Sequence, residues 1–317
     1  MVEPLRVILA KPRGFCAGVV RAVDIVERAL AIHGAPVYVR HEIVHNTHVV
    51  SELAGRGAIF VDELDAVPDG AIVVFSAHGV PRAVEWEASR RGLDVIDATC
   101  PLVRKVHHEG QRYADRGYDV VLIGHREHPE VTGTRGQVNG PLQVVGTAAE
   151  VEALSVRDPA KVAYITQTTL SVTDTREVIG ALKERFPAIL GPDVRDICYA
   201  TQNRQQAVVA LAAQVDLVLV VGSPNSSNSN RLREMSEQVG VPARLIDGPE
   251  HFDPAWLEGV ESVGLTAGAS APERLVTDTI RALSAVRPVV VKTLDGIEET
   301  VRFRLPERLV EAHAPAA

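Results

Sequence analysis

Apolar residues follow two patterns that alternate along the chain, and the alternation is repeated three times. Apolar positions at helical spacing predict helices over three ranges, residues 17–34, 101–117 and 199–215. Short runs rich in β-branched residues predict a strand after each helix, at 36–44, 118–124 and 216–222. A further strand is predicted in each third within the segments 71–81, 161–171 and 262–272, each of which ends in a polar loop. Strands that alternate with helices in this rhythm indicate parallel sheets in an α/β fold.

A polar loop follows each predicted strand. The loops after the first strands read HNTH from residue 45, HREHPE from 125 and SPNSSNSN from 223. The loops after the second strands contain His78, Thr168 and Ser270. Because ligands of open parallel sheets bind beyond the carboxyl ends of the strands, we expect these loops to carry the functional residues.

Each of the three cysteines stands where a predicted helix begins, and the polar loops follow at nearly constant offsets. The offset to the first loop is 28 or 29 residues, measured from Cys16 to His45, Cys100 to His128 and Cys198 to Ser226. This regularity predicts three pseudo-symmetric lobes, each a small, mostly parallel sheet with flanking helices, around a central cavity that holds the cysteines. We expect lobe 1 at 18–100, lobe 2 at 101–197 and lobe 3 at 198–317, the third completed by a strand within residues 1–17.

The chemistry of three such cysteines points to a metal group. A single cysteine is more often a small buried hydrophobe, but three in one context are not explained in that way. A thiol at a helix N-terminus is biased toward thiolate, the form that binds metal. Thiolates suit zinc or an iron–sulfur cluster. Zinc sites usually draw on C-x-x-C pairs, which the chain lacks, so the residues favour a [4Fe–4S] cluster with one iron free of protein ligands.

The polar loops supply residues suited to an anion. The candidates are histidines together with hydroxyl and amide side chains, namely His45, His78, His128, Ser226, Ser227, Asn228 and Ser270. Ser270 and Glu273 also match a capping box, and Asn228 and its neighbours could be ordinary caps. Capping and phosphate binding use the same unpaired N–H groups, so the loops indicate a phosphorylated or diphosphorylated small molecule. Glu130 is a candidate proton donor, with a surface glutamate as the alternative.

Composition and local motifs exclude several classes of protein. Apolar residues make up 46% of the chain and charged residues 23%, as in ordinary globular proteins. A net charge of −8 without a run of basic residues argues against nucleic-acid binding. We expect no membrane span and, because the N-terminus lacks a signal pattern, a cytoplasmic protein. No P-loop or dinucleotide fingerprint occurs, so neither ATP nor a dinucleotide is expected.

The stretch HEIVH, residues 41–45, matches the helical zinc-protease motif by its letters. It continues a run rich in β-branched residues and is predicted as a strand, where the two histidines would lie roughly 13 Å apart. Because the motif needs both imidazoles on one helix face, a zinc protease is rejected.

Taken together, the motifs resemble those of the 4-hydroxy-3-methylbut-2-enyl diphosphate reductase family, the last enzymes of the methylerythritol phosphate route to isoprenoids. The resemblance rests on eight segments in order from residue 13 to residue 272: RGFCAGVVRAV, VHNTHVV, SAHGVP, DATCPLVRKVH, GHREHPEVTGT, TQTTLSV, NSSNSNRL and TAGASAP. The closing LDGIEETVRFRLP is also similar. One position departs from the pattern, because Pro224 stands where many relatives have a basic residue, which leaves helix N-termini and histidines to carry positive charge.

The resemblance implies a [4Fe–4S] cluster held by Cys16, Cys100 and Cys198. It implies that the diphosphate is bound by His45, His78, Ser226, Asn228 and Ser270, with His128 and Ser227 alongside. It further implies that Glu130 delivers protons, that Thr168 orients the substrate hydroxyl, and that Gln167 supports this network.

The implied reaction is a two-electron reductive dehydroxylation of the substrate to isopentenyl and dimethylallyl diphosphate. Electrons would come from a ferredoxin or flavodoxin, because the chain shows no redox domain of its own. Two alternatives stay open on the residues alone. One is a quinolinate synthase-like [4Fe–4S] enzyme, which would need cationic side chains for carboxylates, and the other is a non-catalytic zinc- or phosphate-binding module.

Overall fold

The computed structural model describes residues 3–311. These residues divide into two compact units. Residues 3–19, 45–49 and 199–302 form the first unit, and residues 20–44, 50–198 and 303–311 form the second. Within the described part of the chain, no helix combines the length and the apolar character needed to cross a bilayer.

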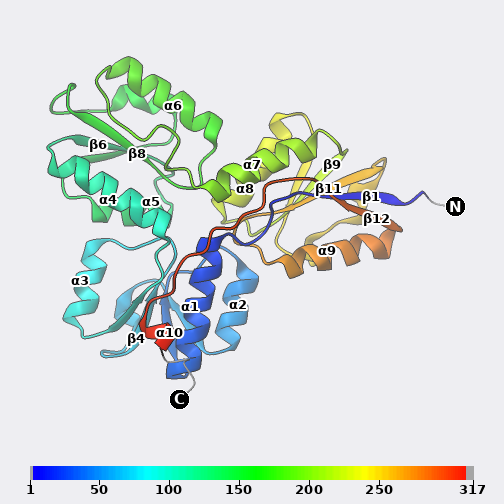
Figure 1. Ribbon diagram of the computed structural model, residues 1–317, viewed down its shortest axis with the longest axis horizontal. Coiled ribbons are helices and arrows are strands. Elements are labelled where there is room, and N and C mark those ends of the chain that lie inside the picture. The colour runs from blue at the N-terminus through cyan, green and yellow to red at the C-terminus, as the bar shows by residue number, and fades with distance from the viewer. Residues whose placement is uncertain (1–2, 312–317) are drawn as a thin grey trace. The chain divides into compact units, whose positions relative to one another are not determined.

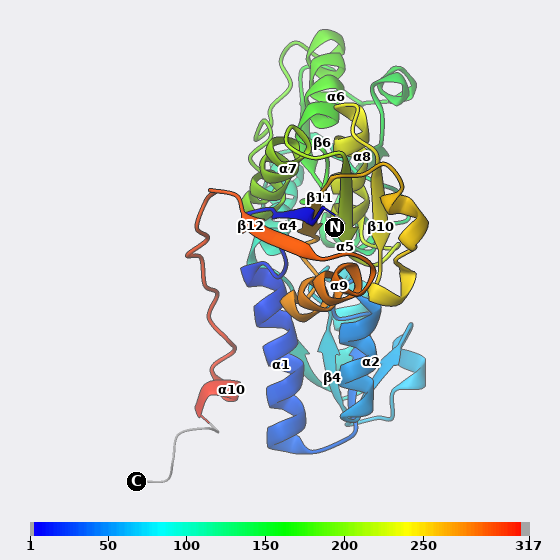
Figure 2. The same ribbon diagram turned by 90° about the vertical axis from the view of Figure 1, so that its right-hand side faces the viewer.

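The first unit is built on one sheet with strand order β10-β9-β11-β1-β12, all pairs being parallel (Figure 1). Its strands are β1 (Leu5–Leu9), β9 (Leu217–Val221), β10 (Ala243–Ile246), β11 (Ser262–Ala267) and β12 (Val289–Thr293). Consecutive residues of β9 alternate between the two faces, because Leu217, Leu219 and Val221 pack with α9 while Val218 and Val220 pack with α7 and α8. Both faces of the sheet are therefore covered by helices, as Figure 2 shows for α9 beside β12.

The second unit contains two smaller parallel sheets, of order β3-β2-β4-β5 and β7-β6-β8. Their strands are β2 (Val37–Arg40), β3 (Ala58–Val61), β4 (Ile72–Phe75), β5 (Asp94–Asp97), β6 (Asp119–Ile123), β7 (Leu142–Val145) and β8 (Val162–Thr166). In β6 the apolar side chains again alternate, Val121 and Ile123 facing α6 and Val120 and Leu122 facing α4 and α5.

Helices flank all three sheets. The helices within the described residues are α1 (Ala17–His33), α2 (Thr47–Gly55), α3 (Arg82–Arg90), α4 (Pro101–Asp115), α5 (Pro129–Gln137), α6 (Val172–Arg185), α7 (Tyr199–Ala212), α8 (Ser227–Gln238), α9 (Glu273–Val286) and α10 (Arg308–Glu311). The three helices expected after the cysteines are confirmed as α1, α4 and α7, with the cysteine directly before the first helical residue in each case.

The three sheets share one topology, which confirms the predicted α/β fold of three small parallel sheets. In each, the first strand after a cysteine lies in the middle of a triplet, giving β3-β2-β4, β7-β6-β8 and β10-β9-β11. The segment before the next cysteine then adds beside the third member, as β5 beside β4 and β1 beside β11. In the middle sheet this segment is reduced to a single bridge between Ala163 and Leu190. The lobe boundaries at 18–100, 101–197 and 198–317 stay a prediction.

The strand predicted over residues 36–44 is shorter than expected. It ends at Arg40, and His41 has a φ of 59°, which takes the chain out of the extended conformation. The stretch HEIVH is thus a bent segment and not a strand, so the prediction for it was wrong in detail. Residues 41–45 are not helical either, so His41 and His45 do not share a helix face.

Candidate active site

The backbone N–H of each cysteine donates to the second polar loop of the preceding repeat, the third repeat preceding the first in this cycle. The Cys16 N–H donates to the Ala269 carbonyl at 3.1 Å, Cys100 to Ala77 at 2.9 Å, and Cys198 to Thr168 at 3.0 Å. Each thiol is partly buried and none forms a disulfide. The repeat inferred from spacing is therefore a repeat of structure, with each cysteine fixed next to Ser270, His78 or Thr168.

The thiols are divided between the two units. Cys16 belongs to the first, and Cys100 and Cys198 belong to the second. Across residues 3–311, no three histidine, cysteine, aspartate or glutamate side chains form a site for a single metal ion. Each unit by itself holds at most two of the thiols.

The loop that carries Cys16 is held by a buried arginine of α7. Arg204 is fully buried, and its guanidinium donates to the Gly14 carbonyl at 2.7 Å and 3.1 Å. The same guanidinium pairs with Glu299 at 3.0 Å. The segment around Glu299, which closes the sequence resemblance, therefore fixes the loop before Cys16 within the first unit.

The first unit brings His45 together with the loops after β9 and β11. The Ser270 hydroxyl donates to the His45 carbonyl at 2.8 Å. Two residues further on, the Thr47 N–H donates to Ser223 Oγ at 3.0 Å. Ser226 is the N-cap of α8, where its hydroxyl accepts from the Ser229 N–H, and Ser227 and Asn228 follow in the first turn. Predicted anion-binding residues of three loops thus meet at one end of this unit.

Ser270 is not a helix cap, so that alternative was wrong. Helix α9 begins at Glu273 with Pro272 at the N-cap position and no side-chain cap. Glu273 instead pairs with Arg13. Pro272, and not Ser270, stands at the N-cap position. The Ser270 hydroxyl instead donates to the His45 carbonyl.

Two buried amides at this end of the first unit lack hydrogen-bond partners among the described residues. Both polar atoms of the Asn228 side chain are orphaned although the residue is only 4% exposed. The Asn46 Nδ2 is orphaned as well, while its Oδ1 caps α2 by accepting from Val49 N–H. Orphaned buried amides are uncommon in native structures, so these two are candidates to contact a ligand. The sequence analysis did not single out Asn46, although it lies within the HNTH loop.

The second unit places Glu130 against Thr168, both buried. Thr168 donates its backbone N–H to Glu130 Oε1 at 2.7 Å and its hydroxyl to Oε2 at 2.8 Å. Glu130 is 2% exposed, which rules out the surface-glutamate alternative. Burial raises the pKa of Glu130 to about 7, against the hydrogen bonds from Thr168, and the nearby Asp196 carboxylate raises it further. A carboxyl poised near neutrality can hold and release a proton at working pH.

His78 and His128 lie edge to face in the same unit, with ring centroids 5.7 Å apart. His128 is the N-cap of α5, where its Nδ1 accepts from the Glu130 N–H at 3.1 Å. An imidazole that accepts at Nδ1 carries its proton on Nε2, so His128 presents a donor at that nitrogen. His128 therefore also fixes the backbone of the proton-holding residue.

Gln167 joins two loops of the second unit. Its Oε1 accepts from the His125 N–H and its Nε2 donates to Thr169 Oγ1, both at 3.0 Å. Both ends of the amide have protein partners, which is the geometry of a supporting residue.

Asp196 was missed by the sequence analysis. It is 3% exposed, accepts from Lys105 Nζ at 3.0 Å and from the Thr166 N–H at 3.3 Å, and raises the pKa of Glu130. The signal for it was the repeated DVxD pattern, which precedes both Cys100 and Cys198.

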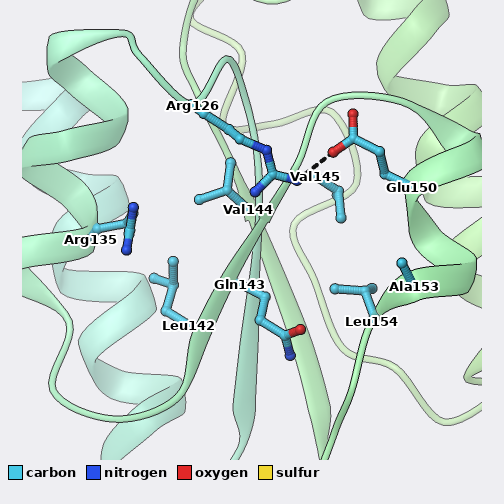
Figure 3. A pocket seen from close by; sticks show the side chains of 9 residues that line it. All are labelled: Arg126, Arg135, Leu142, Gln143, Val144, Val145, Glu150, Ala153 and Leu154. Atoms are coloured by element: carbon cyan, nitrogen blue, oxygen red, sulfur yellow. Dashed lines mark hydrogen bonds and ion pairs between the residues drawn. The ribbon is translucent and has the colours of Figure 1, made fainter.

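A separate pocket of about 320 Å³ lies in the second unit between β7 and the turn after it (Figure 3). Arg126 and Glu150 pair across it, and none of the predicted site residues is among those that line it. It is therefore not a part of the candidate active site.

Comparison with known proteins gives the family. The model of the LytB protein family matches residues 7–284. A 4-hydroxy-3-methylbut-2-enyl diphosphate reductase of Bordetella pertussis is 62% identical over 303 residues, covering 96% of this chain and 93% of the relative. The enzyme of the same name from Zymomonas mobilis is 59% identical over 305 residues, covering 96% and 90%.

Solved structures agree with these relatives. The E-1-hydroxy-2-methyl-but-2-enyl-4-diphosphate reductase of Plasmodium falciparum matches with a TM-score of 0.92 at 37% identity, covering 98% of both chains. A structure of (E)-4-hydroxy-3-methyl-but-2-enyl diphosphate reductase matches with a TM-score of 0.64 at 33% identity, covering 89% of this chain and 99% of the other. These matches favour the reductase over the quinolinate synthase-like enzyme and the binding module. The chain belongs to the LytB protein family.

Proposed function

We propose that this chain is an iron–sulfur oxidoreductase that converts (E)-4-hydroxy-3-methylbut-2-enyl diphosphate into isopentenyl and dimethylallyl diphosphate. In balanced form, an allylic alcohol R–OH takes up two electrons and two protons and gives R–H and water. The observation that carries the proposal is the buried Glu130–Thr168 pair, because Thr168 also accepts from the N–H of Cys198. The candidate proton donor is thereby linked, through Thr168, to the backbone of Cys198, one of the three regularly spaced cysteines.

The thiols fit a [4Fe–4S] cluster. Three cysteines, each at the start of a helix and none in a disulfide, are the donor set that a cubane with one open iron requires. We assign Cys16, Cys100 and Cys198 as its ligands. When bound, the cluster supplies the electrons and a Lewis-acidic iron.

The polar loops fit the diphosphate. We assign His45, His78, Ser226, Asn228 and Ser270 to its oxygens, with His128 and Ser227 alongside. The orphaned amide of Asn228 supports this, because phosphate oxygens accept from an amide Nδ2. Diphosphate binding would also remove the free-energy cost of leaving that amide buried without a partner.

Glu130 and Thr168 have distinct tasks in this proposal. Thr168 orients the hydroxyl of the substrate, and Glu130, protonated because of its burial, gives the proton that leaves with the hydroxyl as water. Gln167 holds the loops that carry both. A ferredoxin or flavodoxin is the proposed electron donor, and the cytoplasmic location stays a prediction.

An anaerobic assay of the cluster-loaded protein tests the proposal. Reduced methyl viologen is the electron source, and its colour should fade only when the hydroxylated diphosphate is added. Cys100→Ser should abolish turnover, and Glu130→Gln should lower kcat about 10²-fold or more, the usual contribution of a positioned acid. A brown wild-type protein that leaves the substrate unchanged would overturn the proposal.

A further inference from the structure

We propose that a basic groove along α4 is the docking surface for a small acidic one-electron carrier protein. The inference rests on the function proposed above and names the surface that its electron donor uses. The groove has a volume of about 800 Å³ and lies wholly within the second unit. Its charged lining consists of Arg104, Lys105, His108, Arg112, Arg195 and a single carboxylate, Glu109.

Most of these cations form a stripe on one helix. Arg104, His108, Arg112 and Arg116 follow one another at intervals of four residues, and all four are exposed. Like charges at this spacing face each other on a helix and disfavour it. The helix dipole favours Arg112 in the last turn and Arg116 at the C-cap, but it does not favour Arg104 near the start of α4. The stability of α4 therefore explains only a part of the stripe.

The positive charge of the stripe is only partly neutralised inside the molecule. Arg104 pairs with Asp97 at 2.6 Å and Arg112 with Glu109 at 3.4 Å. Arg116 and Arg195 form no ion pair with the described residues. Lys105 is engaged by the buried Asp196, so it is a structural part of the groove and not a free cation. Arg116 and Arg195 are thus the charges most available to a partner, and Arg112 keeps 63% of its side chain exposed despite its pair with Glu109.

The groove adjoins the backbone of two proposed cluster ligands. Pro101 in its lining directly follows Cys100, and the Arg104 N–H donates to the Cys100 carbonyl at 3.0 Å. On the opposite wall, Arg195 lies three residues before Cys198. Lys105 Nζ bridges the walls by donating to the Arg195 carbonyl at 3.3 Å. A protein seated here would therefore approach two of the three thiols, as electron transfer requires.

The size and openness of the charged surface favour a protein over a small anion. From Arg104 to Arg116 the stripe extends for about 18 Å at the helical rise of 1.5 Å per residue. Its cations are solvent-exposed side chains, and no orphaned buried polar atom lines the groove, so it is not built to enclose a phosphate. Weak redox encounters use small, charge-complementary interfaces of this kind.

The electron count is simple. Each encounter oxidises one reduced carrier by one electron and reduces the cluster-loaded chain by one electron. Two encounters supply the two electrons that, with two protons, convert R–OH into R–H and water.

The test compares protein carriers with a small-molecule donor. The variants are Arg112→Glu, Arg195→Glu and their combination, with Arg112→Gln to remove charge without reversing it. Arg176→Glu on α6 is the matched control, because Arg176 is equally exposed in the same unit but lies outside the groove. A plant-type [2Fe–2S] ferredoxin and a bacterial flavodoxin are the probes, and reduced methyl viologen is the donor that needs no docking surface.

For the double variant we expect KM for either reduced carrier, and Kd for the oxidised carrier by calorimetry, to rise about tenfold, with a weaker dependence on salt. Turnover with methyl viologen should stay within about twofold of wild type, and Arg176→Glu should change neither constant. Unchanged KM and Kd in the double variant would overturn the docking surface. Failure of the wild type with viologen would instead overturn the proposed function, while the calorimetric Kd would still decide the docking surface.

Discussion

At the scale of single residues, Glu130 is held in a state that an ordinary carboxyl does not adopt at pH 7. Its pKa in the folded protein is about 7, above the usual 4.5, so the folded state binds the proton more tightly than the unfolded state does. The associated stability is fully present below pH 4.5 and is lost as pH rises through 7. The loss amounts to about 3 kcal/mol for a shift of this size.

Glu130→Gln should remove this pH dependence, because the amide cannot ionise. We expect the difference in unfolding free energy between wild type and variant to grow in favour of the variant from pH 5 to pH 8. Denaturant titrations of the anaerobic, cluster-loaded proteins measure it. An equal difference at both pH values would contradict the assignment.

The two polar side-chain atoms of Asn228 are buried and form no hydrogen bond with the described residues. Asn228→Ala should leave the unfolding free energy unchanged or raise it by about 1 kcal/mol, because it removes an unpaired buried amide. The rise in Tm caused by inorganic pyrophosphate should shrink at the same time.

Asn230→Ala is the control for this prediction. The Asn230 amide donates to the carbonyls of Pro224 and Ser226 at 2.6 Å and 3.0 Å, so its loss should lower stability and leave the pyrophosphate response intact. Equal pyrophosphate responses in wild type and Asn228→Ala would contradict a role for Asn228 in binding.

At the scale of elements, Gly222 after β9 and Gly268 after β11 leave room for the Ser229 side chain in the first turn of α8. A Cβ at Gly268 would lie 2.0 Å from Ser229 Oγ, and one at Gly222 would lie 2.2 Å from it. Gly268→Ala should therefore push α8 away from β11 and cost about 1–3 kcal/mol. Ser229→Ala, which removes the clashing oxygen, should recover a part of this loss in a double-mutant cycle of unfolding free energies. Purely additive losses would show that the two positions do not touch.

The loop before Cys16 depends on an element far along the sequence. Glu299→Ala would leave the Arg204 guanidinium buried without its carboxylate, which costs about 3–5 kcal/mol. Iron content after anaerobic reconstitution should fall, because Arg204 also holds the Gly14 carbonyl. The neighbouring Glu298, 84% exposed in its pair with Lys11, is the control, and Glu298→Ala should have almost no effect on either quantity. Full iron loading of Glu299→Ala would show that the Arg204–Glu299 ion pair is not needed to hold the loop before Cys16.

At the scale of the whole molecule, the features that could be predicted from the sequence are those that repeat. The cysteine offsets indicated the shared topology because each repeat needs the same number of residues to pass from helix to strand. The edge strands β3, β7 and β10 were not predicted, because no cysteine or functional loop at a regular offset marks them. Ser270 was assigned two roles because a capping box is a local pattern, and its partner His45 is 225 positions away. The basic stripe was overlooked, although its spacing of four residues within the helix predicted over 101–117 can be read from the sequence.

The place of β1 in its sheet has a consequence for synthesis. Arg6 pairs with Ser262, and Leu5 with Val289, so both neighbours of this strand are synthesised long after it. At about 5–20 residues per second, LRVIL waits roughly 13–50 s for its first partner. An unpaired apolar strand is a site for aggregation during that time. Slower translation or missing chaperones should therefore reduce the yield of this protein before any loss of iron does.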